Sequence, residues 1–282
     1  MRIEASKLVS TQWLEDHLVS TKVKVLDASW YLPGEKRDPK KEFLQSHIPG
    51  AEYFDIDNFS DRNNDLPHMV PTSEQFDDEL KKIGVSDHHH IIVYDGAGQF
   101  SASRAWWLFK LFDVGTVSIL DGGFPKWVLE KRPVSSKISK LAGPSVNSKL
   151  KKHYVCNWKD VKKMALSDPS QIVDARSEDR FFGNAPEPRA GLRSGHIPKS
   201  TNICYKELLN DDNTFKDFDS LRNVFTSKGV DIKRPIIASC GSGVTAAIIF
   251  FALDLLGAKS VALYDGSWCE WGSRPDLPVD TK

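Results

Sequence analysis

Residues 235–247 read Pro-Ile-Ile-Ala-Ser-Cys-Gly-Ser-Gly-Val-Thr-Ala-Ala. A short apolar run ends at Ser239, a loop with two glycines follows Cys240, and a long apolar stretch comes next. This pattern predicts a buried strand, a tight turn and a helix, which is typical of parallel α/β sheets. Such sheets carry ligand sites beyond the carboxyl ends of their strands, so Cys240 falls where a site is expected.

The same pattern occurs in both halves of the 282-residue chain. Four blocks of the first half recur in the same order in the second half: 25–28 as 172–175, 47–49 as 196–198, 91–96 as 236–241, and 117–124 as 261–268. Because order is kept and only the loops differ in length, the blocks indicate a duplicated domain. We therefore expect two tandem domains, 1–140 and 154–282, joined over 141–153 by a linker rich in Ser, Lys, Gly and Pro.

Each half alternates short β-branched runs with helix-like stretches. Strands are expected at 23–26, 91–94, 117–120, 171–173, 235–239 and 260–264, and helices at 10–18, 103–112 and 244–256. This alternation predicts an α/β fold in which each domain is a mostly parallel sheet flanked by helices. The residues directly after the strands then lie at the site edge: Asp27, Asp95, Asp121, Asp174, Cys240 and Asp265.

Charge and apolar patterning exclude several classes of protein. The 38 basic residues balance the 38 acidic ones, which argues against a nucleic-acid binder and against a polybasic membrane anchor. No apolar run approaches the roughly 20 residues of a membrane span. The N-terminus shows no signal-peptide core, so we expect a cytoplasmic protein, with a mitochondrial location as the alternative.

Cysteine and histidine spacing gives no sign of a metal centre. The four cysteines are too few for a disulfide scaffold, and none forms a C-x-x-C pair that would indicate zinc. The run His88-His89-His90 precedes an apolar stretch, which favours a solvated turn over a metal site.

Cys240 differs from the other cysteines in its setting. Glycines at 241 and 243 let the loop curl so that its N–H groups point inward, and the positive end of the next helix lies there too. Such a setting favours the reactive thiolate form of a cysteine. The pattern indicates a nucleophile in an anion-holding loop, the alternative being a small buried hydrophobe. Structural roles are expected for Cys156, Cys204 and Cys269, which lack this setting.

A phosphatase loop would also place a cysteine after a strand. That loop ends in an arginine that grips the phosphate, and the corresponding position here is Ala246. Without the guanidinium, a dianionic phosphate loses its bidentate partner, so phosphatase activity is not expected.

The cysteine loop and its surroundings resemble the two-domain rhodanese-fold sulfurtransferases over nearly the whole chain. The supporting blocks are 27–33 (Asp-Ala-Ser-Trp-Tyr-Leu-Pro), 47–51 (His-Ile-Pro-Gly-Ala), 186–189 (Pro-Glu-Pro-Arg), 195–198 (Gly-His-Ile-Pro) and 265–268 (Asp-Gly-Ser-Trp). Family members that use thiosulfate, a dianion, typically carry basic residues after the cysteine. Here Gly241, Ser242 and Gly243 are uncharged, which suits a monoanionic thiol acid, so the resemblance is greatest to members that use 3-mercaptopyruvate.

This resemblance implies a reaction. Cys240 would take sulfur from 3-mercaptopyruvate as a persulfide, release pyruvate, and pass the sulfur to cyanide, a small thiol or reduced thioredoxin. Neither a metal nor an organic cofactor is required. A thiosulfate-preferring enzyme of the same fold and a non-catalytic sulfur carrier are the alternatives.

The resemblance also implies roles for single residues. Arg180 and Arg189 would bind the substrate carboxylate and ketone, with solvated surface charges as the alternative reading. The loop N–H groups would hold the persulfide; they belong to Gly241, Ser242, Gly243, Val244 and Thr245.

A Ser–His–Asp relay described for the family matches Ser242, His47 and Asp38. His196 occupies the repeat position of His47, so a structural role stays open for both histidines. The alternative for Asp38 is that it is an exposed aspartate in a loop. Since Asp95 replaces Cys240 in the first half, we expect the first domain to be catalytically silent and the second to be catalytic.

Overall fold

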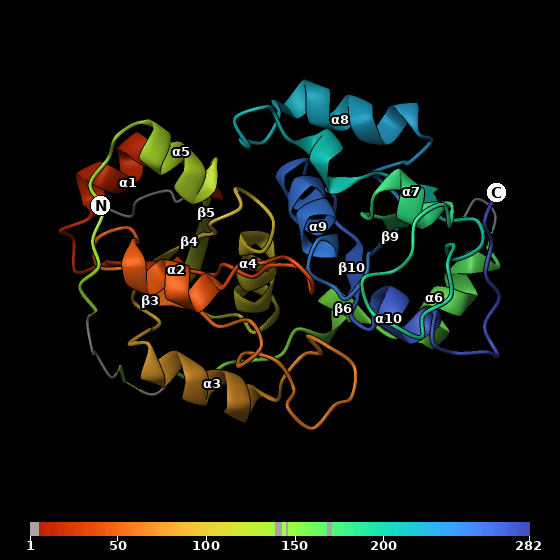
Figure 1. The fold of residues 1–282 in the computed structure, drawn as a ribbon, viewed down its shortest axis with the longest axis horizontal. Helices are drawn as coiled ribbons and strands as arrows, with labels where there is room; N and C mark the ends of the chain where they lie inside the picture. Colours follow the sequence, from red (N-terminus) through yellow and green to blue (C-terminus); the bar gives the residue numbers. More distant parts are fainter. Residues whose placement is uncertain (1–5, 139–142, 145, 168–170) are drawn as a thin grey trace. The chain divides into compact units, whose positions relative to one another are not determined.

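The computed structural model describes residues 6–138, 143–144, 146–167 and 171–282, so residues 141, 142 and 145 of the expected linker lie outside the described residues. The chain forms two compact units (Figure 1). The first comprises Met1–Arg62, Val70–Lys151 and Asp211–Phe215, and the second comprises Asn63–Met69, Lys152–Asn210 and Lys216–Lys282. Each unit therefore includes a short segment from the other half of the sequence.

The first unit contains a five-stranded parallel sheet in the order β1-β5-β4-β2-β3. Its strands are β1 (Leu8–Val9), β2 (Val23–Asp27), β3 (Glu52–Tyr53), β4 (His90–Tyr94) and β5 (Thr116–Leu120). Its helices are α1 (Thr11–His17), α2 (Pro39–Gln45), α3 (Ser73–Lys82), α4 (Ala102–Leu111) and α5 (Gly123–Leu129).

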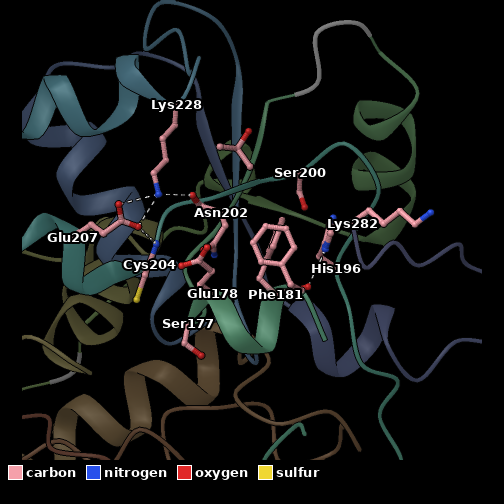
Figure 2. A pocket seen from close by; sticks show the side chains of 12 residues that line it. Ser177, Glu178, Phe181, His196, Ser200, Asn202, Cys204, Glu207, Lys228 and Lys282 are labelled. Atoms are coloured by element: carbon pink, nitrogen blue, oxygen red, sulfur yellow. Dashed lines mark hydrogen bonds and ion pairs between the residues drawn. The ribbon is translucent and has the colours of Figure 1, made fainter. Parts of the chain in front are cut away.

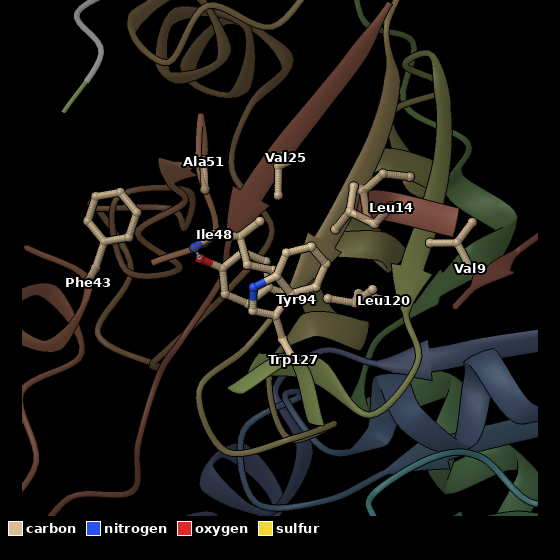
Figure 3. Close-up of a cluster of buried hydrophobic side chains, with 10 residues drawn as sticks. Val9, Leu14, Val25, Phe43, Ile48, Ala51, Tyr94, Leu120 and Trp127 are labelled. Carbon is tan, nitrogen blue, oxygen red and sulfur yellow. Dashed lines mark hydrogen bonds between the residues drawn. The ribbon is translucent and has the colours of Figure 1, made fainter. Parts of the chain in front are cut away.

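Alternation along β4 explains how the first sheet is covered. Successive strand residues point to opposite faces, and Ile92 and Tyr94 belong to one buried cluster (Figure 3). The other members of that cluster are Val9, Leu14, Val25, Phe43, Ile48, Ala51, Leu120 and Trp127. Ile91 and Val93 are equally buried and point to the opposite face, and α4, which packs on β4 and β5, is buried along most of its length. Both faces of the sheet are thus covered, as expected for parallel strands.

The second unit repeats this architecture strand for strand, in the order β6-β10-β9-β7-β8, again all parallel. Its strands are β6 (Val155–Cys156), β7 (Ile172–Asp174), β8 (Thr201–Asn202), β9 (Ile236–Ser239) and β10 (Val261–Tyr264). Its helices are α6 (Trp158–Ala165), α7 (Glu178–Phe181), α8 (Phe218–Ser227), α9 (Ala246–Leu255) and α10 (Ser267–Trp271), with 3-10 turns η1 (Lys152–Tyr154) and η2 (Tyr205–Leu208). The prediction of two similar α/β domains with parallel sheets is confirmed.

The middle strand of the second sheet leads directly to the cysteine loop. All four residues of β9 are buried, and α9 is apolar all round, with every residue from Ala246 to Leu253 buried. A helix of that kind is stable only when it is enclosed, so α9 fixes the far end of the loop as firmly as β9 fixes its start. Cys240 therefore stands at the centre of the carboxyl edge of the sheet.

Two local features differ from the sequence prediction. The outer strands β1, β3 and β6 were not predicted, since each is two residues long and too short to show a pattern. The histidine run is not wholly a solvated turn: His90 begins β4, is buried, and has its Nε2 2.7 Å from the Ser118 hydroxyl. Within the described residues, no helix has the length and apolar character that crossing a membrane requires.

Candidate active site

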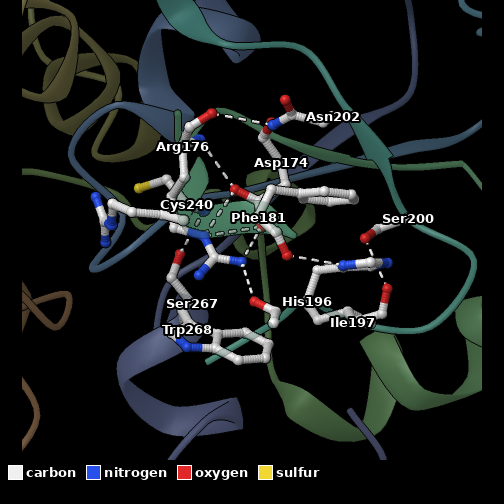
Figure 4. A network of polar contacts seen from close by, with 12 residues as sticks. Asp174, Arg176, Phe181, His196, Ile197, Ser200, Asn202, Cys240, Ser267 and Trp268 are labelled. Atoms are coloured by element: carbon white, nitrogen blue, oxygen red, sulfur yellow. Dashed lines mark hydrogen bonds and ion pairs between the residues drawn. The ribbon is translucent and has the colours of Figure 1, made fainter. Parts of the chain in front are cut away.

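The loop from Cys240 to Thr245 is anchored to the start of α10. Trp268 N–H donates to the Cys240 carbonyl at 2.9 Å, and Cys269 N–H donates to the Gly241 carbonyl at 2.8 Å. The Cys240 N–H donates to the Ser267 hydroxyl at 3.2 Å, shown with its surroundings in Figure 4. Ser267 has a positive φ of 47°, a strained backbone that the surrounding contacts hold in place. These bonds fix the loop at the Cys240 thiol, whose residue is only 2% exposed.

The N-terminus of α9 opens on this loop without a side-chain cap. Thr245 is the N-cap residue, and its side chain makes no capping hydrogen bond. Gly243 takes a positive φ of 79°, a conformation that glycine adopts without steric cost. Helix N-termini attract anions, because their first N–H groups lack partners within the helix.

Ser242 is hydrogen-bonded to a histidine from a distant part of the sequence. His68 Nδ1 lies 3.0 Å from Ser242 Oγ and 3.2 Å from the Ser242 carbonyl. His68 is buried, and it belongs to the segment Asn63–Met69, which packs as part of the second unit. A serine hydroxyl and an imidazole in contact form a path for a proton, two residues from the thiol.

A guanidinium lies against the loop at Gly241. A methyl group placed on Gly241 would come within 2.9 Å of Arg180 Nη2, so only glycine leaves room for this arginine. Arg180 lies on α7, directly after β7, and its Nε and Nη2 donate to the two carboxylate oxygens of Glu187 at 3.2 and 2.5 Å. The sequence-predicted Arg180 and Gly241 are thus brought together beside Cys240.

The positive charge of Arg189 affects the pKa of the Cys269 thiol. Burial raises the pKa of this thiol, and the positive charges of Arg189 and Arg180 lower it in part, while Cys240 and Glu187 raise it. Arg189 therefore acts on the same small region as Arg180 and Cys240. The two arginines predicted from the sequence thus both lie near enough to Cys269 for their positive charges to act on its thiol.

This arrangement matches a known family. The family model described as "Rhodanese-like domain" matches residues 10–130 and 157–274. The chain belongs to the rhodanese-like family.

Several similar proteins are sulfurtransferases by name. The chain is 40% identical to human 3-mercaptopyruvate sulfurtransferase, over 95% of this chain and 92% of the human one. It is 41% identical to rat thiosulfate sulfurtransferase, over 98% of this chain and 94% of the rat one. The crystal structure of the 3-mercaptopyruvate sulfotransferase SseA from Escherichia coli matches it with a TM-score of 0.84 and 38% identity, covering 94% of this chain and 99% of SseA.

The contacts of His47 do not support its place in a proton relay. Its Nδ1 lies 2.6 Å from the Phe43 carbonyl and its Nε2 lies 3.1 Å from the Lys137 carbonyl, so main-chain oxygens already occupy both ring nitrogens. Its backbone pairs with Ser135 in an isolated bridge. These are the contacts of a structural residue of the first unit.

His196, the repeat counterpart of His47, is held in the same way. Its Nδ1 lies 2.9 Å from the Phe181 carbonyl, its ring stacks on that phenylalanine, and its backbone pairs with Asp280. The shared geometry favours the structural alternative for both histidines. Asp38 is likewise engaged locally, because it caps α2 by accepting the Lys41 N–H at 3.0 Å.

Sequence reasoning missed His68 and Glu187. His68 lies in a loop segment with no counterpart in the repeat, 174 residues from Ser242, so neither periodicity nor duplication marked it. Glu187 stood within the Pro186–Arg189 block, yet a single carboxylate between prolines gave no sign of its two arginine partners. Arg176, two residues after Asp174, forms an ion pair with it at 2.7 Å.

A pocket in the second unit is lined by residues other than those of the Cys240 loop. Its volume is about 670 Å³, and Figure 2 shows Cys204, Glu207 and Lys228 among its lining side chains. Lys228 Nζ pairs with Glu207 at 2.8 Å and donates to the Asn202 carbonyl at 3.0 Å. Burial raises the pKa of the Cys204 thiol, which therefore stays protonated, in keeping with the structural role expected from the sequence.

Proposed function

We propose that this protein is a sulfurtransferase that moves sulfur from 3-mercaptopyruvate to a thiol, thioredoxin or cyanide through a persulfide on Cys240. The observation that carries the proposal is the meeting of a buried cysteine, an uncapped helix N-terminus and the Arg180 guanidinium at one loop. The names of the relatives agree with it.

In the first half-reaction, the Cys240 thiolate attacks the donor sulfur. The S–S bond of the persulfide forms, the C–S bond of the donor breaks, and its electron pair remains on carbon as the enolate of pyruvate. Arg180 binds the donor carboxylate, and Arg189 binds its ketone and stabilises the enolate as its charge develops. The loop N–H groups from Gly241 to Thr245 hold the persulfide anion.

The enolate needs a proton before pyruvate leaves. We propose that Ser242 and His68 deliver it, because their side chains are in hydrogen-bond contact and Ser242 lies two residues from the nucleophile. This pair takes the place that the sequence match had given to His47 and Asp38. In the second half-reaction, the acceptor thiolate attacks the outer sulfur, and Cys240 leaves as the thiolate.

We propose that catalysis belongs to the second domain, residues 154–282. The first domain, residues 1–140, and the linker, residues 141–153, keep the bounds expected from the sequence. We propose the cytoplasm as its compartment, because all four cysteines are free thiols, as a reducing environment would keep them. A mitochondrial location is the alternative, since the relatives include an Arabidopsis enzyme named as mitochondrial.

Steady-state kinetics with two donors test the function. We expect a higher kcat/KM for 3-mercaptopyruvate than for thiosulfate, each measured with cyanide and with reduced thioredoxin as acceptor. A higher kcat/KM for thiosulfate would make the thiosulfate-preferring alternative correct. Absence of turnover with either donor would favour a sulfur carrier.

A further inference from the structure

Glu187 is a buried carboxylate shared by two arginines. Its side chain is 2% exposed, its Oε1 accepts from Arg176 Nη1 at 2.8 Å, and its Oε2 accepts from Arg180 Nη2 at 2.5 Å. Arg180 Nε adds a second bond to Oε1 at 3.2 Å. A buried charge is stable only when it is paired and hydrogen-bonded, and Glu187 satisfies that condition through these two guanidinium groups.

Arg176 gives this carboxylate a rigid support. Its guanidinium is fully buried and donates to both Asp174 oxygens, to the Gly195 carbonyl and to Glu187. The guanidinium also stacks over the Trp268 ring, 4.4 Å from its centre (Figure 4). Since Asp174 ends β7, the chain of contacts begins at the sheet and runs through Arg176 to Glu187.

Arg180 receives its orientation from Glu187. The carboxylate takes the Nε and Nη2 edge of the guanidinium, and Nη2 is also the atom closest to Gly241. Within the described part of the chain, Nη1 has no hydrogen-bond partner, so the edge formed by Nη1 and Nη2 is available to a ligand. Arg180 is 17% exposed, in contrast to the buried Arg176, as a group that meets a ligand needs to be.

We propose that Glu187 is a positioning and selectivity residue, which aims Arg180 at the carboxylate of the donor and keeps the site selective for a monoanion. This inference rests on the proposed function. The second part follows from charge: Asp174, Arg176, Glu187 and Arg180 together carry no net charge. Removing the charge of Glu187 leaves an uncompensated positive charge beside the thiol, which strengthens the attraction of a dianion such as thiosulfate more than that of a monoanion.

A double-mutant cycle tests the positioning role. We expect Glu187→Gln to raise the KM for 3-mercaptopyruvate by about ten-fold with kcat changed less than about two-fold, since Arg180 contacts an unreacting part of the donor. In the Arg180→Ala background the same change should alter KM by less than about two-fold, because its effect passes through Arg180. An equal effect of Glu187→Gln with and without Arg180 would show a merely structural role and overturn the inference.

Two further variants separate charge from geometry. Glu187→Asp keeps the charge but is shorter by one methylene, so it should raise KM and leave the ratio of the two donors' kcat/KM unchanged. Glu187→Gln should move that ratio toward thiosulfate by about three- to ten-fold. The matched control is Glu178→Gln on α7, an exposed residue expected to change neither quantity.

The outcomes separate this inference from the proposed function. Unchanged KM in Arg180→Ala would remove Arg180 from the donor site and overturn both. A raised KM in Arg180→Ala with wild-type kinetics in Glu187→Gln would overturn only the role of Glu187. If Glu187→Gln does not fold, the Glu187→Asp cycle decides, and unchanged KM in that variant contradicts positioning.

Discussion

The loops after β4 and β9 occupy equivalent positions in two sheets of the same strand order, yet they handle negative charge differently. After β4, the Asp95 carboxylate is fully buried and accepts N–H groups of its own loop and of the start of α4. The donors are Ala97 at 3.0 Å and Phe100, Ser101 and Ala102 at 2.8 Å each. The first loop thus holds an anion that belongs to its own side chain.

After β9, a thiol stands at the position of Asp95. The Cys240 thiol is a weaker acceptor than a carboxylate, and the side chain of Thr245, the N-cap residue of α9, makes no capping hydrogen bond. Ser242 replaces Ala97 and supplies a hydroxyl. The difference teaches that the same strand–loop–helix design holds a carboxylate of its own in one unit and a thiol with a neighbouring hydroxyl in the other.

The glycines that follow differ in what they face. A methyl group on Gly96 would lie 2.6 Å from the Tyr31 hydroxyl, 3.1 Å from the Ser29 hydroxyl and 3.8 Å from Arg37 Nη2. On Gly241 it would lie 2.9 Å from Arg180 Nη2. A guanidinium is therefore the nearest group at the second loop, whereas two hydroxyls lie nearer than Arg37 at the first.

The largest expected effect tests whether the two loops are exchangeable. Cys240→Ser should lower sulfur transfer by at least about a thousand-fold, because the hydroxyl cannot form a persulfide. Adding Asp95→Cys to that variant should restore nothing, since the first loop has Ala97 where the second has the Ser242 hydroxyl. Cyanide-dependent turnover measures both. Recovered activity in the double variant would show that the thiol alone decides, whatever surrounds it.

The next effect concerns the contact between His68 and the Ser242 hydroxyl, a hydroxyl that only the second loop carries. His68→Asn should slow transfer by about a hundred-fold, as expected when a proton donor is lost. His47→Asn, the matched change at a histidine held by two carbonyls, should leave kcat within about two-fold. Single-turnover release of pyruvate measures the step directly. If His47→Asn is the slower variant, the relay inferred from the sequence match is the correct one.

Removing the internal anion of the first loop should affect stability and leave the chemistry intact. Asp95→Ala leaves four N–H groups without their acceptor, two of them buried and two partly buried, which should lower the free energy of unfolding by about 3–5 kcal/mol. Asp95→Asn keeps an acceptor oxygen and should cost less. Chemical denaturation of the two variants and the wild type gives the difference. Equal losses in both variants would contradict the account of Asp95 as an internal anion.

The smallest effect is a pH dependence confined to the first unit. Burial raises the pKa of Asp27 from 3.8 to about 6. The folded state therefore holds a proton that the unfolded state releases between these values, and stability falls as pH rises from about 4 to 6. Asp27→Asn should remove up to about 3 kcal/mol of this fall. Denaturation midpoints across this range check it, and an unchanged slope would contradict it.

The sequence predicted the strands and helices that recur in both halves of the chain. The matched blocks predicted the three central strands of each sheet and placed Cys240 after β9. The helix-like stretches predicted α4 and α9. The two arginines that we propose bind the donor carboxylate and ketone came from the family resemblance, and Arg180 does lie against Gly241. Asp174 and Arg176 were readable as a pair because they are two residues apart.

What the sequence could not predict depends on contacts between distant segments. His68 reaches Ser242 because Asn63–Met69 packs with the second unit, a fact with no local signature. Glu187 joins two arginines only after α7 and its following loop fold back together. The relay described for the family pointed to His47, whereas the repeat, which places His196 at the same position, pointed to the structural role that the contacts of both histidines favour.

The most direct test of the central claim is the mass of the intact protein after brief exposure to 3-mercaptopyruvate without an acceptor. We predict a gain of one sulfur atom, located on the peptide that contains Cys240, and its loss when reduced thioredoxin is added. The Asp95 loop should gain nothing. An unchanged mass, or sulfur found on Cys156, Cys204 or Cys269 instead, would contradict the assignment of Cys240 as the nucleophile.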